Sequence, residues 1–421
     1  MFMGKTATGS RDESSRLEST SHSMSKLSSP GTILLPEPPL DALEAAEEQM
    51  DPSIWSMLPV ELVDCILVWL PMPSLVQMRR VCRSWDLTIK SKPFNRMYME
   101  MPSKGPAWLF MCSSFNCREH ACAYNPLQNK WHNFPLSFLP PCMRFPLTAV
   151  GGLLFVRGGL NNQGLLGVCN PMTQAWRELP SMTHTRLNFL VGICCEEDTE
   201  SSSYKIVVAG GTTSECGGGD YECTTEVYDS LTDSWQVTGK VGRELTVHLT
   251  WWTSNTIFCN GVLYCLTSGR PYSIIAYDIK TAEWMELQVP PPKFLFCSFL
   301  IERRGKLMFV GGVGTQRICE HVHIWQLSQG SGTQQQWVEV AKMPHEYFLQ
   351  FFKERNASDL KCAGNADLVY FFKDSHTEVM VCDFSKKPTE WRWLPTCPLS
   401  ANFHKFSVRS LFVNPRLDAS I

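Results

Sequence analysis

Residues 54–99 read IWSMLPVELVDCILVWLPMPSLVQMRRVCRSWDLTIKSKPFNRMYM, and this stretch decides how the rest of the chain is interpreted. Pro59 predicts the start of a helix, because proline at the first helical position has its backbone torsion already set and lacks only a donor that would be unpaired there. One side of this helix is predicted to be apolar, since apolar residues recur every four positions. These residues are Leu58, Leu62, Ile66 and Leu70.

Two further short helices are predicted in the same stretch. The second follows Pro71 and carries Leu75, and the third carries Trp85 and ends at Pro93. Three short helices cannot bury this much apolar surface among themselves, because a unit of about 45 residues is only marginally stable alone. We therefore expect a partner surface.

The stretch resembles the F-box. The Leu-Pro opening, the Leu-Pro break between the first two helices and the ending VCRSW at 81–85 match that family in order and spacing. The resemblance implies docking onto the Skp-type adaptor of a cullin-based ubiquitin ligase, and through it onto a cullin and a RING subunit. An alternative is an ordinary helical subdomain packed on its own chain. The adaptor-binding residues that the resemblance implies are Leu58, Pro59, Leu62, Ile66, Leu70, Pro71, Leu75, Val81 and Trp85.

Length and composition narrow the class of protein. A chain of 421 residues exceeds what one core usually organises, so we expect several units or one repetitive unit. The formal net charge is -3, so the chain lacks the overall positive charge that favours binding to nucleic acid or to an anionic membrane. Eighteen cysteines without a signal peptide predict reduced thiols in the nucleus or cytoplasm. No apolar run is long enough to predict a membrane span.

Residues 1–52 are rich in Ser and Pro and hold few residues that can build a core, which predicts a disordered tail. A short docking element within residues 33–50 is the alternative. We assign 53–99 to the F-box, 100–106 to a linker and 416–421 to a C-terminal tail.

Residues 107–415 have the pattern of a repetitive β structure: short apolar runs separated by Gly, Pro, Asn and Asp. In the first four units a Tyr or Cys followed by Asn or Asp precedes the repeated Trp by seven residues, and the last two units are looser. The repeated tryptophans are Trp131, Trp176, Trp235, Trp284, Trp337 and Trp391.

This repeat resembles the kelch repeat, which implies a β-propeller. Six units over about 310 residues give about 52 residues each, close to the kelch period of about 50. The first unit has only three strands before its Trp, whereas the chain ends with an extra strand at 406–413. A closed ring leaves no free sheet edge, so we predict that this strand completes the first blade. The predicted fold is thus a small helical F-box followed by a six-bladed kelch-type propeller.

Together the two parts resemble plant F-box/kelch-repeat proteins, in the group that includes Unusual Floral Organs and Leaf Curling Responsiveness. The tryptophans and tyrosines of the repeat are expected to pack between blades. Glycine pairs such as 158–159 are not followed by a helix, so they do not predict a phosphate site. We expect no cofactor and no metal: the spacing of Cys112, Cys117, His120 and Cys122 fits no common zinc pattern.

Substrate binding is predicted at the propeller loops, where cationic and aromatic residues recur. If these loops share one face, they suit an acidic or phosphorylated protein segment. The alternative is a set of scattered, solvated charges. The candidate residues are Arg144, Arg186, Arg270, Tyr272, Lys293, Arg317, His345, Tyr347 and His404.

The resemblance favours a non-catalytic substrate receptor of a ubiquitin ligase. A kelch scaffold without any role in ubiquitination is the alternative, and a propeller enzyme is a weaker third reading. No G-x-S-x-G, H-E-x-x-H or P-loop motif supports an enzyme.

Overall fold

The computed structural model describes residues 57–101, 106–113, 116–159, 164–197, 202–213, 220–246, 256–267, 273–315, 318–329, 335–352, 360–373, 378–399, 408–419 and 421. The chain divides after Leu58 into two units, and the second unit, residues 59–421, holds the elements described below. The predicted disorder of residues 1–52 concerns residues outside these ranges. Within them, no helix is long and apolar enough to cross a membrane.

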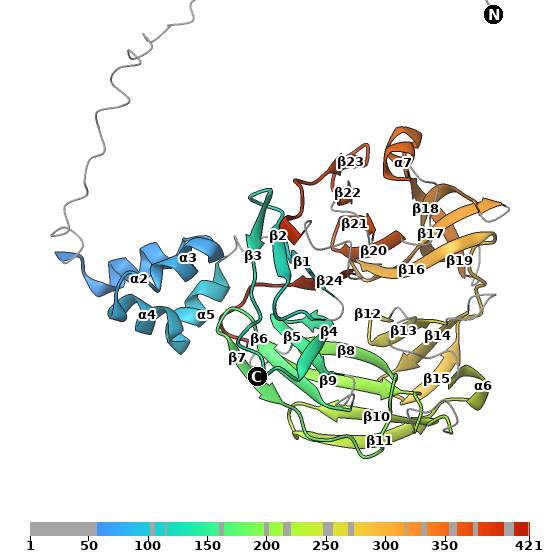
Figure 1. Ribbon diagram of the computed structural model, residues 1–421, viewed down its shortest axis with the longest axis horizontal. Helices are drawn as coiled ribbons and strands as arrows, with labels where there is room; N and C mark the ends of the chain where they lie inside the picture. Colours follow the sequence, from blue (N-terminus) through green and yellow to red (C-terminus); the bar gives the residue numbers. More distant parts are fainter. Residues whose placement is uncertain are drawn as a thin grey trace, which may run out of the picture. The chain divides into compact units, whose positions relative to one another are not determined.

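Residues 57–101 contain four helices, one more than predicted for the F-box stretch (Figure 1). The third predicted helix ends at Lys90, three residues before Pro93. Pro93 itself lies in the first turn of α5, where the side chain of Ser91 accepts a hydrogen bond from Phe94 N at 3.3 Å. Proline suits this position for the same reason that it suits the start of any helix. The helices are α2 (Val60–Val68), α3 (Met72–Met78), α4 (Arg83–Lys90) and α5 (Lys92–Glu100).

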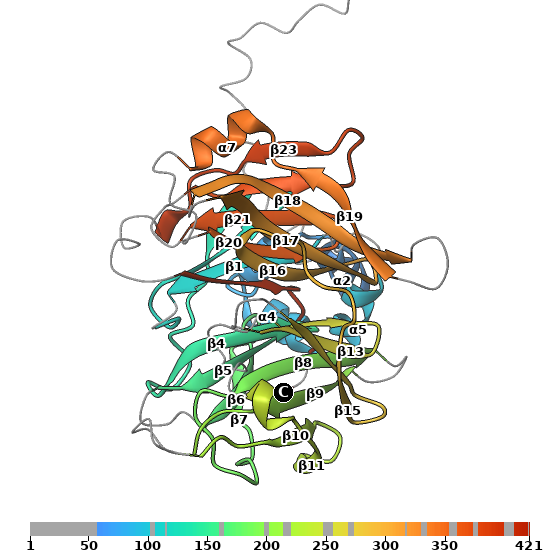
Figure 2. The same ribbon diagram turned by 90° about the vertical axis from the view of Figure 1, so that its right-hand side faces the viewer.

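Six four-stranded antiparallel sheets form the rest of the described structure, and they confirm the predicted six-bladed propeller (Figures 1 and 2). Two short helices, α6 (Arg243–Thr246) and α7 (His345–Phe351), lie in connections between blades. Blade 1 contains β24 (Val408–Val413), β1 (Trp108–Ser113), β2 (Ala121–Asn125) and β3 (Lys130–Asn133). Blade 2 contains β4 (Met143–Val150), β5 (Leu153–Gly158), β6 (Leu166–Asn170) and β7 (Ala175–Glu178). Blade 3 contains β8 (Leu190–Glu197), β9 (Ser202–Ala209), β10 (Thr224–Asp229) and β11 (Ser234–Lys240).

The other three blades repeat this order of strands. Blade 4 contains β12 (Thr256–Cys259), β13 (Val262–Leu266), β14 (Ile274–Asp278) and β15 (Glu283–Glu286). Blade 5 contains β16 (Leu295–Arg303), β17 (Lys306–Thr315), β18 (Ile318–Gln329) and β19 (Gln335–Lys342). Blade 6 contains β20 (Leu360–Asn365), β21 (Leu368–Lys373), β22 (Met380–Asp383) and β23 (Glu390–Trp393).

The C-terminal strand closes blade 1, as the sequence predicts. β24 pairs with all of β1, from Trp108 opposite Val413 to Ser113 opposite Val408. The residues after it also pack on the body: Leu417 is 7% exposed and Asn170 donates to the carbonyl oxygen of Ala419 at 2.9 Å. The ring is therefore closed by hydrogen bonds between the two ends of the propeller sequence.

The seven-residue spacing of the repeat has a structural reason. It places Tyr124 directly opposite Trp131, with a turn between them. Asn125, which follows the tyrosine, accepts a hydrogen bond from Leu127 N at 3.0 Å, and this Asx turn fixes the register of the two strands. The same bond forms at Asn170, Asp229, Asp278 and Asp383.

Tryptophans of the repeat join neighbouring blades, which confirms their predicted role. Trp235 Nε1 of blade 3 donates to Pro180 O, just after blade 2, and Trp284 Nε1 of blade 4 donates to Thr225 Oγ1 of blade 3, both at 2.8 Å. Blade 5 departs from the pattern because β18 and β19 have a register shift at Ile324/Trp325.

The alternation of strands gives the propeller two distinct faces. The first strands of successive blades contact one another around the ring, so they are the innermost strands. We call the face where these first strands begin the start face, and the opposite one the turn face. Because neighbouring strands are antiparallel, the start face also carries the connections between second and third strands and those between blades.

Candidate functional site

The first candidate surface is the exposed apolar side of α2. Leu62 is 50% exposed and Ile66 is 41% exposed, and both were predicted to bind the adaptor. A neighbour that the sequence reasoning missed, Trp69, is 67% exposed and lies on the same side of the helix. Large apolar side chains in such a cluster mark an interaction site more often than single ones do. Of the other predicted residues, Pro59, Pro71 and Val81 are exposed, and Leu58, Leu70 and Trp85 are partly exposed.

Leu75 does not belong to this surface. Its side chain is 0% exposed and lies in the core that the helices share with blades 1 and 2, so it is a core residue and not a contact residue. Leu70 packs against the same core. The helical period explains why Leu70 does not continue the exposed side of α2. Each four-residue step turns by more than 360°, so Leu70 is rotated by about 80° from Leu62 around the helix axis.

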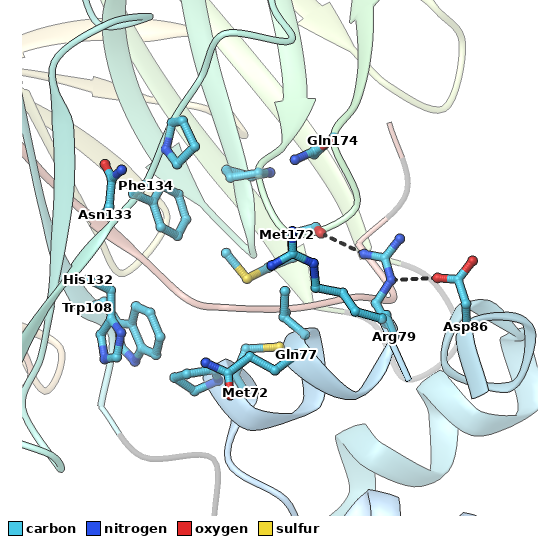
Figure 3. Close-up of a pocket in the computed structure, with 15 residues that line it drawn as sticks. Met72, Gln77, Arg79, Asp86, Trp108, His132, Asn133, Phe134, Met172 and Gln174 are labelled. Atoms are coloured by element: carbon cyan, nitrogen blue, oxygen red, sulfur yellow. Dashed lines mark hydrogen bonds and ion pairs between the residues drawn. The ribbon is translucent and has the colours of Figure 1, made fainter. Parts of the chain in front are cut away.

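The helices are fixed to the turn face of blades 1 and 2 (Figure 3). Arg79 Nε donates to Asp86 Oδ1 at 2.9 Å, and its Nη1 donates to Met172 O, in the β6–β7 turn, at 3.5 Å. Hydrogen bonds from Lys90 and then from Arg79 hold the pKa of Asp86 below its usual value. The cavity beside this contact has a volume of about 690 Å³ and is lined by apolar residues of α3 and blade 1 together with polar ones.

The second candidate surface is the start face. Arg144 is the second residue of β4, Lys293 precedes β16, and His345 and Tyr347 lie on α7 between β19 and β20. The topology therefore places these predicted residues on one face. The side chains of Arg144, Lys293 and His345 are exposed and that of Tyr347 is partly exposed. The predictions for Arg270, Tyr272, Arg317 and His404 concern residues outside the described part of the chain.

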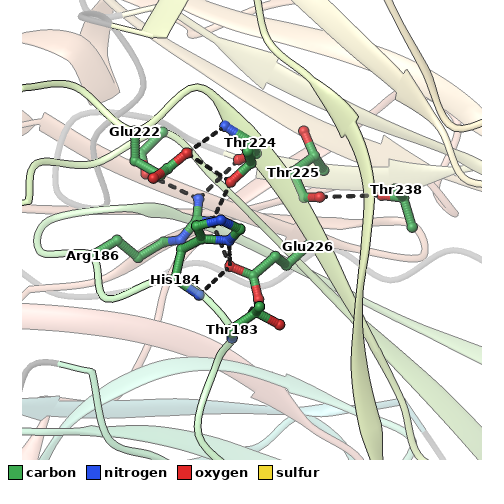
Figure 4. A network of polar contacts seen from close by, with 9 residues as sticks. Thr183, His184, Arg186, Glu222, Thr224, Thr225, Glu226 and Thr238 are labelled. Carbon is green, nitrogen blue, oxygen red and sulfur yellow. Dashed lines mark hydrogen bonds and ion pairs between the residues drawn. The ribbon is translucent and has the colours of Figure 1, made fainter.

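Arg186 must be removed from the predicted set, because its side chain is 0% exposed. Figure 4 shows its polar contacts. Its Nη2 donates to Glu226 Oε1 at 2.6 Å and its Nη1 to Thr224 O at 2.9 Å. Glu226, also buried, accepts hydrogen bonds from the backbone amides of Thr183 and His184 at 2.7 and 3.1 Å. The guanidinium thus fixes the connection from blade 2 to blade 3 and is not available to a substrate.

Glu226 remains ionised in this network. Burial opposes ionisation, but the hydrogen bonds from Thr183 N and Arg186 outweigh it and hold the pKa of the carboxyl below its usual value. A carboxyl whose folded-state pKa is lowered stabilises the fold above its unfolded pKa, and this contribution disappears as the pH falls through the folded pKa.

Glu226→Gln is therefore expected to lower the free energy of unfolding by about 3–5 kcal/mol at neutral pH, since it leaves Arg186 buried without a counter-charge. Chemical denaturation measured across a pH series would test this, because the difference from wild type should shrink on acidification. The Arg186→Met/Glu226→Gln double variant should lose less than the sum of the two single variants. Additive losses would show that the two side chains do not act as a pair.

The cysteines whose spacing fits no common zinc pattern lie on two sides of blade 1. Cys122 Sγ lies 3.4 Å from Cys397 Sγ, whereas Cys112 and Cys117 lie in a different core cluster. Among the residues that the structure describes, no group of three or more His, Cys, Asp or Glu side chains could hold a metal ion.

Comparison with known proteins agrees with both parts of the architecture. The F-box domain profile matches residues 55–97, and the profile of the F-box associated beta propeller domain matches residues 143–402. The chain is 23% identical to Protein UNUSUAL FLORAL ORGANS of Arabidopsis thaliana, covering 84% of this chain and 81% of the relative. It is 29% identical to F-box only protein 6 of the same species (83% and 71% covered) and 26% identical to Protein ABERRANT PANICLE ORGANIZATION 1 of Oryza sativa subsp. japonica (87% and 88%). This protein belongs to the family of F-box proteins that carry an F-box associated β-propeller domain.

Proposed function

We propose that this protein is the substrate-recognition subunit of a Skp–cullin–F-box ubiquitin ligase. The observation that carries the proposal is the exposed apolar surface of α2, on helices whose other side is fixed to a closed propeller. The propeller does not require that surface for its own stability, because β24 already closes its ring of sheets. The F-box helices bind the Skp-type adaptor and through it the cullin and the RING subunit.

In this proposal the propeller binds the protein substrate and the chain itself catalyses no step. Ubiquitin transfer belongs to the other subunits, and the receptor acts by holding its substrate near them. The start face is the substrate face, since the turn face of blades 1 and 2 is occupied by the helices. The protein acts in the nucleus or the cytoplasm, where the thiols of a cysteine-rich chain stay reduced.

Co-expression with a Skp-type adaptor, a cullin and a RING subunit tests this proposal. The full chain is expected to elute with all three in size-exclusion chromatography, and the complex is expected to ubiquitinate proteins captured from cell extract. A chain that elutes alone would support the scaffold alternative. Proximity labelling with wild type and with an adaptor-binding variant should then identify substrates, which accumulate when the adaptor is not bound.

A further inference from the structure

The cavity of about 690 Å³ beside the Arg79 contact lies where the F-box helices meet blades 1 and 2 (Figure 3). We call it the junction cavity. Its walls come from three separate parts of the chain: residues between Met72 and Asp86, Trp108 together with residues 132–135 at the end of β3, and residues 171–174 of the β6–β7 turn. Small-molecule sites have volumes of about 300–1,000 Å³ and occur preferentially where two packed parts of a protein meet. The size and position of the junction cavity are therefore those of a ligand site.

One wall of the junction cavity is flat and aromatic. Trp108 in β1 is 7% exposed and stacks on His132 in β3, with ring centroids 5.2 Å apart and an angle of 19° between the ring planes. Phe134 and Met172, each less than a tenth exposed, also line the cavity. Aromatic rings pack favourably on one another in stacked and edge-to-face arrangements. A flat apolar ring system would therefore find complementary contacts on this wall.

Several polar groups of the junction cavity have no partner among the residues that the structure describes. The indole N–H of Trp108 has no acceptor there, although the side chain is largely buried. Three amide side chains and one guanidinium at the cavity are exposed and form no hydrogen bond or ion pair with any described residue. These four residues are Gln77, Arg80, Asn133 and Gln174. The lining thus combines apolar walls with polar groups that remain available to a ligand.

The charges that line the junction cavity favour an anionic ligand. The carboxylate in the lining, Asp86, already accepts hydrogen bonds from Arg79 at 2.9 Å and from Lys90 at 2.5 Å. The guanidinium of Arg80 is therefore left without a counter-charge among the described residues. His132 adds no charge near neutral pH, because burial lowers its pKa.

We propose that the junction cavity binds a small molecule in which a flat ring system carries a carboxylate. The ring system packs against Trp108 and Phe134, and the carboxylate accepts hydrogen bonds from Arg80. Arginine suits this role, since its guanidinium forms paired hydrogen bonds with a carboxylate. The site is separate from the proposed adaptor surface on α2 and from the start face. Because its walls belong to both the F-box helices and the propeller, the ligand adds contacts between these two parts of the protein.

Displacement of a fluorescent probe from the full chain tests this assignment. The probe is 1-anilinonaphthalene-8-sulfonate, an aromatic anion whose fluorescence rises in apolar surroundings. The competitors are 2-naphthoate and 2-naphthamide, which share one ring system and differ in charge. We expect saturable binding of one probe per chain. The acid should displace it at about a tenfold lower concentration than the amide, the value of a charge-assisted hydrogen bond.

Two exposed arginines give a matched control. Arg80 lines the junction cavity, whereas Arg83, the first residue of α4, does not. Arg80→Gln should weaken binding of 2-naphthoate by about tenfold and leave binding of 2-naphthamide unchanged, and Arg83→Gln should change neither. Both variants should keep the wild-type melting temperature, because both side chains are exposed. Equal effects of the two variants, or equal displacement by the acid and the amide, would overturn the assignment.

A larger side chain at Val76 tests the location of the site. Val76 is partly buried and lines the junction cavity from α3, so Val76→Trp should fill part of the space and weaken binding of both competitors at least tenfold. Circular dichroism shows whether this variant is folded. A folded variant that binds the probe as wild type does would place the bound probe elsewhere and contradict the proposal. If Val76→Trp does not fold, the comparison of Arg80→Gln with Arg83→Gln decides.

Discussion

The Leu62→Glu/Ile66→Glu double variant is expected to lose adaptor binding by about 100-fold or more while the propeller stays folded. About half of each side chain is exposed in the free protein. Fully burying an apolar side chain of this size is worth about 1.5–3 kcal/mol, so two half-exposed ones are worth about 1.5–3 kcal/mol together, and a carboxylate buried in the interface without a partner costs several kcal/mol more. Each 1.4 kcal/mol changes the dissociation constant about tenfold. Biolayer interferometry with immobilised Skp-type adaptor measures the loss.

A matched control exists in the propeller. Leu231 is 69% exposed in the β10–β11 turn, so Leu231→Glu introduces the same charge at a similarly exposed leucine. This control should bind the adaptor as wild type does, and the double variant should keep the wild-type thermal unfolding curve because neither residue lies in the core. If the double variant binds within threefold of wild type, the exposed side of α2 is not the adaptor surface.

A chain that ends after residue 407 is expected to have no stable propeller. The truncation removes β24, the only partner of the inner edge of β1. It also removes four large apolar side chains that are less than a tenth exposed: Val408, Leu411, Val413 and Leu417. At about 1.5–3 kcal/mol each, their loss amounts to about 6–12 kcal/mol, comparable to the whole stability of a typical domain, about 5–15 kcal/mol.

Circular dichroism and size-exclusion chromatography would show this loss as a missing unfolding transition and as aggregation through the free edge of β1. A chain ending after residue 414 separates the strand from the segment that follows it. That control keeps β24 and loses only the contacts of residues 415–421, so it should unfold cooperatively at a lower temperature than wild type. A cooperative transition in the shorter chain would mean that three strands suffice for blade 1.

Local features of the sequence were enough to predict the propeller. The segment from Tyr124 to Trp131 contains the end of one strand, an Asx turn and the start of the next strand. This short segment therefore specifies its own hairpin. The same segment recurs with small changes along the chain, and a repeat of this length predicts a blade. Closure by the C-terminal strand followed from a general property of sheets, which is that free edges are avoided.

Features that depend on distant residues were not predictable. From its local sequence, Arg186 was expected to be an exposed cation in a loop. Its burial depends on Glu226, which lies 40 residues later in the next blade. Leu75 was misassigned for a similar reason, since the core that covers it includes residues of blades 1 and 2.

Ring closure by β24 also determines when the two proposed binding surfaces are completed during synthesis. The F-box helices leave the ribosome first, whereas about 300 residues separate β1 from the strand that completes its blade. At about 5–20 residues per second, this interval lasts about 15–60 s. The residues of the proposed adaptor surface are therefore synthesised well before the start face is complete. An incomplete chain would carry the adaptor-binding residues without a substrate site. A new receptor can therefore bind substrate only after its last strand has paired with β1.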